Sequence, residues 1–409
     1  MGRWMASSCV VLLAGLLSAA PTVGASGHAP ITITSDAGFT TCSCVASGSG
    51  STSNPYVIGP LSVTNLRGDG VHIDGSTLTK SFVLYNVTAN KNAGNGITLN
   101  HINTAGGSTV VAKIYGGHTT ANNNVWGVRV ENSRGVTLDG VGVNSGGPGV
   151  AASGFATANT NRLGGIDLEN SSNITVRGWQ MNANGSDSAP DWITFDPSTS
   201  RWSGGALRMF GVTGSTIDHN AANNSVDGHF MLFDSSANTI SNNTAGYPYT
   251  MNFLLTDGSS HNTLTGNDAW DGDYAGVLVA DPLPGSATLN QYGTTHDNTI
   301  THNNIHSNGP TGAELKAGLV PAFLGGIVLL NGTYDNSVAD NSTYASTGTD
   351  LAWAQAVPDA STPIGVKTYK PLLHCNVTAY DGPGSPPAFG GNVWSGNTYK
   401  TIDPCLPSQ

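Results

Sequence analysis

An internal repeat constrains the fold of this chain more than any other feature of its sequence. Each copy has a short apolar segment, a turn of Asn, Asp, Gly or Ser, and a second apolar triplet that ends in polar residues. The clearest copies are WGVRVENSRGVTLDG from Trp126, GGIDLENSSNITVRG from Gly164, GGALRMFGVTGSTIDHN from Gly204, GHFMLFDSSANTISNN from Gly228, NFLLTDGSSHNTLTGN from Asn252, AGVLVADPLPGSATLNQYGTTHDNTITHN from Ala275 and GGIVLLNGTYDNSVADN from Gly325. Such a unit cannot bury its apolar residues alone, so the repeat predicts a solenoid of stacked copies that share one core.

The spacing of the copies indicates regular coils with occasional insertions. Ile217 and Ile240 are 23 residues apart, and Ile240 and Leu264 are 24 residues apart. The next two intervals, to Ile300 and then to Val338, lengthen to 36 and 38 residues because turn-rich segments intervene. Three positions after each anchor the residue is asparagine: Asn220, Asn243, Asn267, Asn303 and Asn341. Stacked strands favour such a column, because each side-chain amide can hydrogen-bond its neighbour in the next coil.

These repeats resemble those of the right-handed parallel β-helix superfamily, the pectate-lyase-like fold, and particularly its NosD-type repeat proteins. The resemblance covers roughly residues 54–346. It implies an all-β, single-stranded right-handed parallel β-helix of about a dozen coils, which at roughly 4.8 Å per coil makes a rod about 55–60 Å long. The superfamily includes polysaccharide lyases, glycosidases, epimerases and members without known catalysis, so the resemblance implies a fold more than a reaction.

The composition agrees with turn-rich β-structure and disfavours several classes of partner. Only 10% of the residues are charged, against about 25% in typical globular proteins. The chain therefore lacks the charged residues that would cover long amphipathic helices. The formal net charge of −11 opposes nucleic acid or an anionic membrane as a partner. No segment after residue 25 approaches the roughly 18 apolar residues that a membrane span needs.

The order of segments along the chain predicts four regions. These are a signal peptide at 1–25, an N-terminal cap at 26–60, the parallel β-helix at 61–346 and a C-terminal cap or tail at 347–409. The first region has a basic start at Arg3, an apolar core and a small-residue cleavage site after Ala25, so we expect a secreted protein. In the tail, the stretch DLAWAQAV could be helical, within a cap that blunts the open edge of the last coil.

Four cysteines follow the signal peptide, as suits an oxidising compartment. Cys42 and Cys44 belong to one end of the expected rod, and Cys375 and Cys405 to the other. The Cα atoms of a disulfide must lie within about 7 Å of each other, which disfavours pairing between the ends. We therefore expect a Cys375–Cys405 disulfide in the C-terminal cap, while Cys42 and Cys44 either form a tight ring or remain free thiols.

Side chains of a coil strand alternate between the core and the outward face. In GGIDLEN, Ile166 and Leu168 point inward, so Asp167 and Glu169 point outward. The same register predicts two outward columns that run along the coils. The first contains His72, Thr98, Arg129, Asp167, Arg208, Met231, Leu254, Leu278 and Val328, and the second contains Asp74, Asn100, Glu131, Glu169, Phe210, Phe233, Thr256, Ala280 and Leu330. Both columns change from charged to apolar midway.

The charged part of these columns is the candidate catalytic site. Its five residues lie on three successive coils: Arg129, Glu131, Asp167, Glu169 and Arg208. Six of the eight arginines and two of the three glutamates lie between positions 129 and 208. Arginine suits bidentate recognition of a carboxylate, and two glutamates on adjacent coils suit the retaining glycosidase geometry of about 5 Å. Alternatively, these residues form cross-strand ion pairs that only decorate a solvated face.

Insertions at 148–163 and 186–203 precede two of these strands and should project over the site. The second insertion carries the predicted sugar-binding residues Trp192, Phe195, Arg201 and Trp202. Its aromatic rings could instead pack on the apolar part of the outward columns. We expect a loop, the C-terminal tail or another subunit to cover that apolar part, because such patches are seldom left wet. If another subunit provides this cover, the protein forms a homo-oligomer.

Metal sites are weakly indicated. Three aspartates end successive strands: Asp234, Asp257 and Asp281. The equivalent residues in other coils are Asn132, Asn170 and Asn331. The position therefore favours a turn-forming Asx residue, and a Ca²⁺ site of stacked carboxylates is the alternative. The histidines, including His302 and His306, show no spacing typical of a metal site, so the sequence gives no support for copper and requires no cofactor.

These features favour a secreted enzyme that acts on a polysaccharide or oligosaccharide. Arginine clustering in an acidic protein favours a polysaccharide lyase acting on a uronate-containing glycan. Arg129 and Arg208 would neutralise the uronate, and Glu169, Asp167 or a neighbouring arginine would take the C5 proton. The alternatives are a retaining glycoside hydrolase that uses Glu131 and Glu169, and a non-catalytic, glycan-binding or structural β-helix protein.

Overall fold

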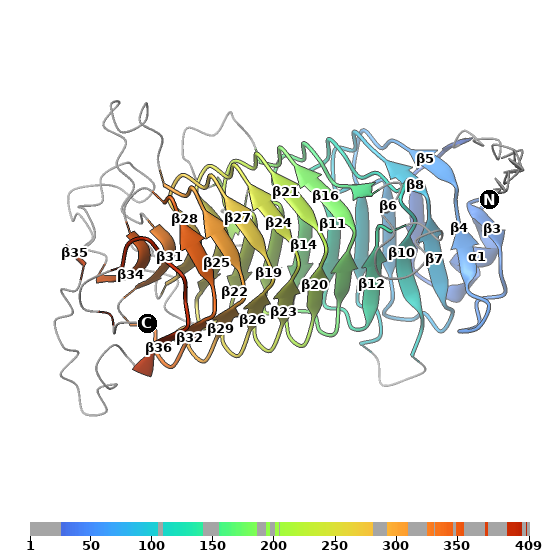
Figure 1. Ribbon diagram of the computed structural model, residues 1–409. Coiled ribbons are helices and arrows are strands. Elements are labelled where there is room, and N and C mark those ends of the chain that lie inside the picture. The colour runs from blue at the N-terminus through green and yellow to red at the C-terminus, as the bar shows by residue number, and fades with distance from the viewer. Residues whose placement is uncertain are drawn as a thin grey trace, which may run out of the picture.

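The chain winds into a rod of stacked coils, as the computed structural model in Figure 1 shows. The structure describes residues 26–104, 109–141, 155–185, 194–196, 201–203, 205–280, 293–309, 325–330, 332–346, 349–355, 373–374, 391–402 and 406. Helix α1 (Asp36–Thr41) lies near the N-terminal end of the rod. Nowhere in these ranges is a helix long and apolar enough to cross a membrane.

Three long sheets run along the rod. Sheet 1 contains β2 (Ile31–Ile33), β6 (Val71–Asp74), β9 (Ile97–Asn100), β11 (Trp126–Glu131), β14 (Gly164–Glu169), β19 (Leu207–Phe210), β22 (Phe230–Phe233), β25 (Met251–Thr256), β28 (Ala275–Val279), β31 (Gly325–Leu330), β34 (Thr349–Gln355) and β35 (Leu373–His374). Sheet 2 contains β3 (Val45–Ser47), β4 (Tyr56–Ile58), β7 (Phe82–Tyr85), β10 (Ala112–Tyr115), β12 (Val136–Asp139), β15 (Thr175–Arg177), β20 (Thr216–Asp218), β23 (Thr239–Ser241), β26 (Thr263–Thr265), β29 (Thr299–Thr301), β32 (Ser337–Ala339) and β36 (Val393–Ser395). Sheet 3 contains β13 (Ala156–Thr157), β16 (Trp179–Asn182), β21 (Ala221–Asn223), β24 (Thr244–Gly246), β27 (Asp268–Trp270), β30 (Asn304–His306) and β33 (Ser342–Tyr344).

Two small sheets complete the described strands. One contains β1 (Ser26–His28), β5 (Leu61–Val63) and β8 (Val87–Ala89), and the other pairs β17 (Thr194–Asp196) with β18 (Arg201–Ser203). Neighbouring strands of the long sheets are parallel except at the ends of sheets 1 and 2, where β34–β35 and β3–β4 pair in antiparallel fashion. Eleven parallel strands in each of sheets 1 and 2 agree with the expected number of about a dozen coils.

The stretch DLAWAQAV departs from its expected helical structure. Its first six residues belong to β34, which pairs in parallel register with β31. The open edge of β31 offers unpaired backbone groups, and pairing with them outweighs the local helix propensity of the alanines. Sheet 1 therefore continues into the region expected to be a cap.

The interior of the rod is a continuous apolar core. The inward residues of the GGIDLEN strand, Ile166 and Leu168, are fully buried, as are their neighbours in adjacent coils. Gly165 lies where a Cβ would come within 2.5 Å of the carbonyl oxygen of Ala206 in the next coil. Only glycine allows the two coils to approach this closely.

The predicted asparagine ladder is confirmed. The Nδ2 group of Asn267 donates to Oδ1 of Asn303 at 3.0 Å, and Oδ1 of Asn267 accepts from Nδ2 of Asn243 at 3.0 Å. A second ladder runs in parallel through Asn238, Asn262, Asn298, Asn336 and Asn392. Buried amides are thereby satisfied at each turn, which stabilises the stack of coils.

The N-terminal cysteines form a disulfide between Cys42 and Cys44. The tight ring is therefore the correct one of the two alternatives. Cys375 and Cys405 lie outside the described residues, so their pairing stays a prediction.

Candidate functional site

The two outward columns of sheet 1 have the register that the repeat predicts. Arg129 pairs with Asp167, which in turn pairs with Arg208 on the following strand. In the second column, Glu131 pairs with Glu169. Five side chains from β11, β14 and β19 thus meet on one face, and we call them the charged cluster: Arg129, Glu131, Asp167, Glu169 and Arg208.

Arg129 lies at the centre of the charged cluster. Its Nη2 atom is 2.8 Å from Oε2 of Glu169, and its Nε atom is 3.2 Å from Oδ2 of Asp167 and also contacts Oε1 of Glu131. Burial opposes the charge on Arg129, but the charges of Asp167, Glu131 and Glu169 raise its pKa overall. With its side chain 24% exposed, Arg129 links three carboxylates and still reaches the surface.

Arg208 has a different environment from Arg129. Its Nε and Nη2 atoms donate to the two carboxylate oxygens of Asp167 at 2.8 and 3.0 Å, and the two residues are 1% and 0% exposed. The guanidinium also lies over the indole of Trp126, 4.8 Å from the ring centroid. A Cβ on Gly164 would come within 2.0 Å of that indole, so this glycine makes room for the ring that supports Arg208.

The environment of Glu131, a member of the charged cluster, raises the pKa of its carboxyl group. Burial raises its pKa, and the negative charges of Glu169 and Asp167 raise it further, while Arg129 opposes them. The two glutamates are neighbours in register on adjacent strands, so their backbones are separated by roughly the strand spacing of 4.8 Å. Both glutamates contact the guanidinium of Arg129, and the environment of Glu131 favours its protonated form.

A histidine lies two strands from Arg129, with Thr98 between them, and was not among the predicted site residues. His72 lies in the first outward column, and its Nδ1 atom is 3.3 Å from Oδ2 of Asp69. That hydrogen bond raises the pKa of His72 against the effect of burial, with a further contribution from the charge of Glu131. Its column position was the sequence signal that could have identified it.

The predicted sugar-binding residues are only partly described. Strands β17 and β18 form an antiparallel pair that aligns Phe195 with Trp202 and Asp196 with Arg201. The side chains of these residues, and the whole of Trp192, lie outside the described part of the structure. Their role stays a prediction.

Beyond Arg208 the outward face of sheet 1 is apolar, as its columns predict. The residues form a second hydrophobic cluster, separate from the core: Phe210, Met231, Phe233, Met251, Leu254, Ala275, Leu278, Ala280, Val328, Leu330 and Ala352. All of them are buried. The charged cluster therefore lies where the outward face of sheet 1 changes from polar to apolar.

The strand-ending aspartates occupy a turn position. Asp234 and Asp257 have φ values of 45° and 53°, and Asn132 and Asn170 both have 46°. Asn and Asp adopt this left-handed conformation more readily than most residues. The conformation of the turn therefore explains why Asn or Asp recurs at this position. Asp281 lies outside the described residues, and a Ca²⁺ site of all three aspartates stays a prediction.

Comparison with known proteins identifies the architecture. The family model described as "Right handed beta helix region" matches residues 193–350. The chain has the right-handed parallel β-helix fold. No curated protein sequence matches it significantly.

Several solved structures are similar to the chain at low identity. The periplasmic alginate epimerase AlgG is 12% identical, with a TM-score of 0.44 over 90% of this chain and 84% of that one. The A-module of the Azotobacter vinelandii mannuronan C-5 epimerase AlgE6 is 12% identical, with a TM-score of 0.37 over 87% of this chain and 90% of that module. Pectate lyase Pel9A is 11% identical, with a TM-score of 0.37 over 76% of this chain and 70% of that enzyme. Similarity at this level does not carry an activity from one protein to another.

Proposed function

We propose that the chain is a carbohydrate-active protein that hydrolyses a glycosidic bond with retention of configuration, using Glu131 as acid and base and Glu169 as nucleophile. The observation that carries this proposal is the pairing of Glu131 with Glu169 on adjacent strands, both in contact with Arg129. The predicted signal peptide supports action outside the cell, where polysaccharides are accessible.

The spacing and the protonation of the two glutamates suit this reaction. Retaining glycosidases hold their two carboxyl groups about 5–5.5 Å apart, close to the spacing expected for neighbours on adjacent coils. The raised pKa of Glu131 suits the group that protonates the leaving oxygen. Glu169 would attack the anomeric carbon, and Glu131 would then deprotonate the water that releases the sugar.

The charges of the charged cluster favour hydrolysis over elimination. As Glu131 gives up its proton, two guanidinium groups face three carboxylates, and the excess negative charge stabilises the positive charge that develops on the sugar ring. Both guanidinium groups already contact carboxylates of the charged cluster. The guanidinium groups that would neutralise the carboxylate of a uronate are therefore already paired with protein carboxylates.

The remaining residues would position the reacting groups or bind the sugar. Arg129 would hold both glutamates at a fixed separation. The buried Asp167, itself paired with Arg208, would in turn fix the position of Arg129 through their contact. Trp192, Phe195, Arg201 and Trp202 would supply the sugar-binding surface expected from the sequence.

One observation favours a polysaccharide lyase as the second candidate. The Arg129 side chain is partly exposed beside two glutamate carboxylates, so it could pair with a uronate while Glu169, Asp167 or a neighbouring arginine removes the C5 proton. This function requires the substrate carboxylate to displace at least one protein carboxylate from Arg129.

A glycan panel separates these functions. The mature chain is incubated with neutral polysaccharides and with pectate, alginate and glucuronan, with and without Ca²⁺, while reducing ends and the ultraviolet absorbance of unsaturated products are followed. Hydrolysis predicts new reducing ends without absorbance, whereas elimination predicts both. Glu131→Gln and Glu169→Gln should each lower the rate at least about 100-fold, while the exposed turn variant Asp335→Asn should leave it unchanged. No product from any glycan would refute both reactions and favour a glycan-binding or structural protein.

A further inference from the structure

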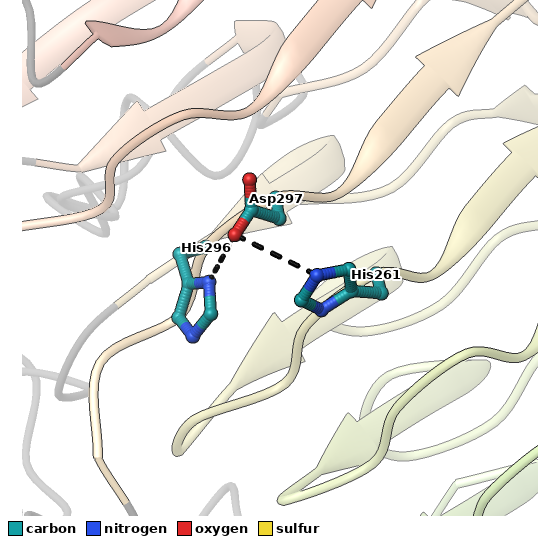
Figure 2. A group of neighbouring side chains, drawn as sticks. All are labelled: His261, His296 and Asp297. Carbon is teal, nitrogen blue, oxygen red and sulfur yellow. Dashed lines mark hydrogen bonds and ion pairs between the residues drawn. The ribbon is translucent and has the colours of Figure 1, made fainter.

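We propose that His261, His296 and Asp297 bind one divalent transition-metal ion of the Zn²⁺ class. In the described part of the chain, they are the one group of at least three His, Cys, Asp or Glu side chains whose ligand atoms all lie within 4.8 Å of one another. Figure 2 shows the carboxylate of Asp297 facing both imidazole rings. The site is separate from β11, β14 and β19 and does not rest on the proposed carbohydrate chemistry.

The fold brings these residues together from two adjacent coils. His261 lies in the turn between β25 and β26, and His296 and Asp297 lie in the turn before β29. A bridge between Ser260 and His296 fixes the register. His261 and Asp297 therefore occupy equivalent positions, and both have positive φ values, 57° and 52°. The shared register places an imidazole of one coil beside a carboxylate of the next.

The distances suit a small tetrahedral ion. Oδ2 of Asp297 is 2.7 Å from Nδ1 of His296 and 3.8 Å from Nε2 of His261. A tetrahedral Zn²⁺ with bonds of about 2.0–2.1 Å separates its ligand atoms by roughly 3.3 Å. The two observed distances lie on either side of this value. Small rotations of the exposed His261 and Asp297 side chains would complete the geometry.

The donor atoms decide the class of metal. Two imidazole nitrogens and one carboxylate suit Zn²⁺, Cu²⁺ or Ni²⁺, whereas Ca²⁺ and Mg²⁺ prefer oxygen ligands alone. His296 stacks on Tyr334 of the following coil, with ring centroids 4.7 Å apart and planes 9° apart. That contact restricts the imidazole, so less side-chain freedom is lost when the metal binds. Three protein ligands leave one tetrahedral position for water.

A metal at this site would join two coils of the native chain. Because the three ligands converge only when the coils stack, the ion would bind the folded state in preference to the unfolded state. Metal binding should therefore raise the thermal unfolding temperature of the full chain.

Isothermal titration of the tag-free, full-length mature chain with Zn²⁺ tests the site. We expect one ion per chain, and an affinity at least tenfold lower in both His261→Asn and Asp297→Asn, since loss of even outer-shell partners costs 10–100-fold. Asparagine tolerates the left-handed conformation at both positions. His302→Asn is the matched control, because His302 is exposed with a φ of 56° and has no place in the group.

The outcomes are distinct. Retained binding in His302→Asn with weakened binding in the other two variants supports the site, as does a Cu²⁺ electron paramagnetic resonance signal with coupling to two nitrogens. Absence of Zn²⁺ binding by the native chain would overturn the proposal. Equal binding by the native chain and His261→Asn, or equal loss in all three variants, would overturn it as well. None of these results depends on whether a glycan is cleaved.

Discussion

Replacing Arg208 with methionine tests whether its ion pair with the buried Asp167 stabilises the fold. The change removes two hydrogen bonds, of 2.8 and 3.0 Å, from a carboxylate that is 0% exposed. Losing one partner of a buried ion pair costs about 3–5 kcal/mol. Arg129 stays 3.2 Å from Asp167 and compensates part of the charge, and methionine keeps apolar contact with Trp126. We therefore expect a loss of about 3 kcal/mol in the free energy of unfolding, near the lower end of that range.

Urea unfolding followed by far-ultraviolet circular dichroism measures this loss. The double variant Asp167→Leu/Arg208→Met should recover most of the stability, because removing both buried charges is often neutral or stabilising. Arg177→Met serves as a comparison, since the Arg177 side chain is 51% exposed although its partner Asp139 is only 8% exposed, and it should cost less than Arg208→Met because water reaches the guanidinium side of the pair. An unchanged unfolding midpoint for Arg208→Met, or a double variant no more stable than the single one, would refute the reasoning.

Three further predictions concern the stack of coils and its ends. Asn267→Ala should lower the free energy of unfolding by about 1–3 kcal/mol, because it removes the acceptor of the buried Asn243 N–H; Asn303 Oδ1 still accepts from the Asn267 N–H, and Asn243 Nδ2 still donates to the Ile217 carbonyl; urea unfolding tests it. Burial raises the pKa of Asp227 from 3.8 to about 7, so the folded chain binds one more proton than the unfolded chain between these values. The contribution of Asp227 to stability should therefore fall as the pH rises from about 4 to about 7. Burial lowers the pKa of His229 from 6.5 to about 3, so His229 contributes the opposite slope, and Asp227→Asn should make stability rise more steeply with pH than in the native chain, as measured by urea unfolding. Thiol titration of the unfolded, unreduced chain without residues 1–25 should find no free cysteine; two free thiols would contradict the Cys375–Cys405 disulfide.

Much of the fold could be predicted from the sequence because β-strands alternate with a period of two. A one-residue slip would turn every core residue outward, so the apolar pattern fixes the register. The pairing of Arg129, Asp167 and Arg208 follows from that rule alone. The asparagine ladder through Asn267 could likewise be predicted, because one residue type recurs at one position of each coil.

The burial of the charged side chains could not be predicted in the same way. Arg129 and Arg208 occupy the same outward column, yet one side chain is 24% exposed and the other 1%. The difference depends on three-dimensional packing, including the indole of Trp126 beside Gly164. Sequence position gave both arginines the same role in substrate recognition, whereas their environments favour different roles.

The grouping of His261, His296 and Asp297 also could not be predicted from residue spacing in the sequence. His261 and His296 lie in neighbouring columns of adjacent coils, and the interval between these coils is one of the lengthened ones. No fixed separation along the chain marks such a pair. Only the register of the turns brings both imidazoles to Asp297.

Peptide mass mapping of the chain during turnover of a glycan that it cleaves tests the central claim most directly. If Glu169 is the nucleophile of a retaining hydrolase, Glu131→Gln supplied with a glycosyl fluoride of that glycan should accumulate one glycosyl adduct on the peptide that contains Glu169, because fluoride leaves without protonation whereas release of the sugar needs the base at position 131. The adduct should disappear when Glu169→Gln is added to that variant. Turnover without any adduct at Glu169, or with undiminished rate in Glu169→Gln, would contradict the proposed function.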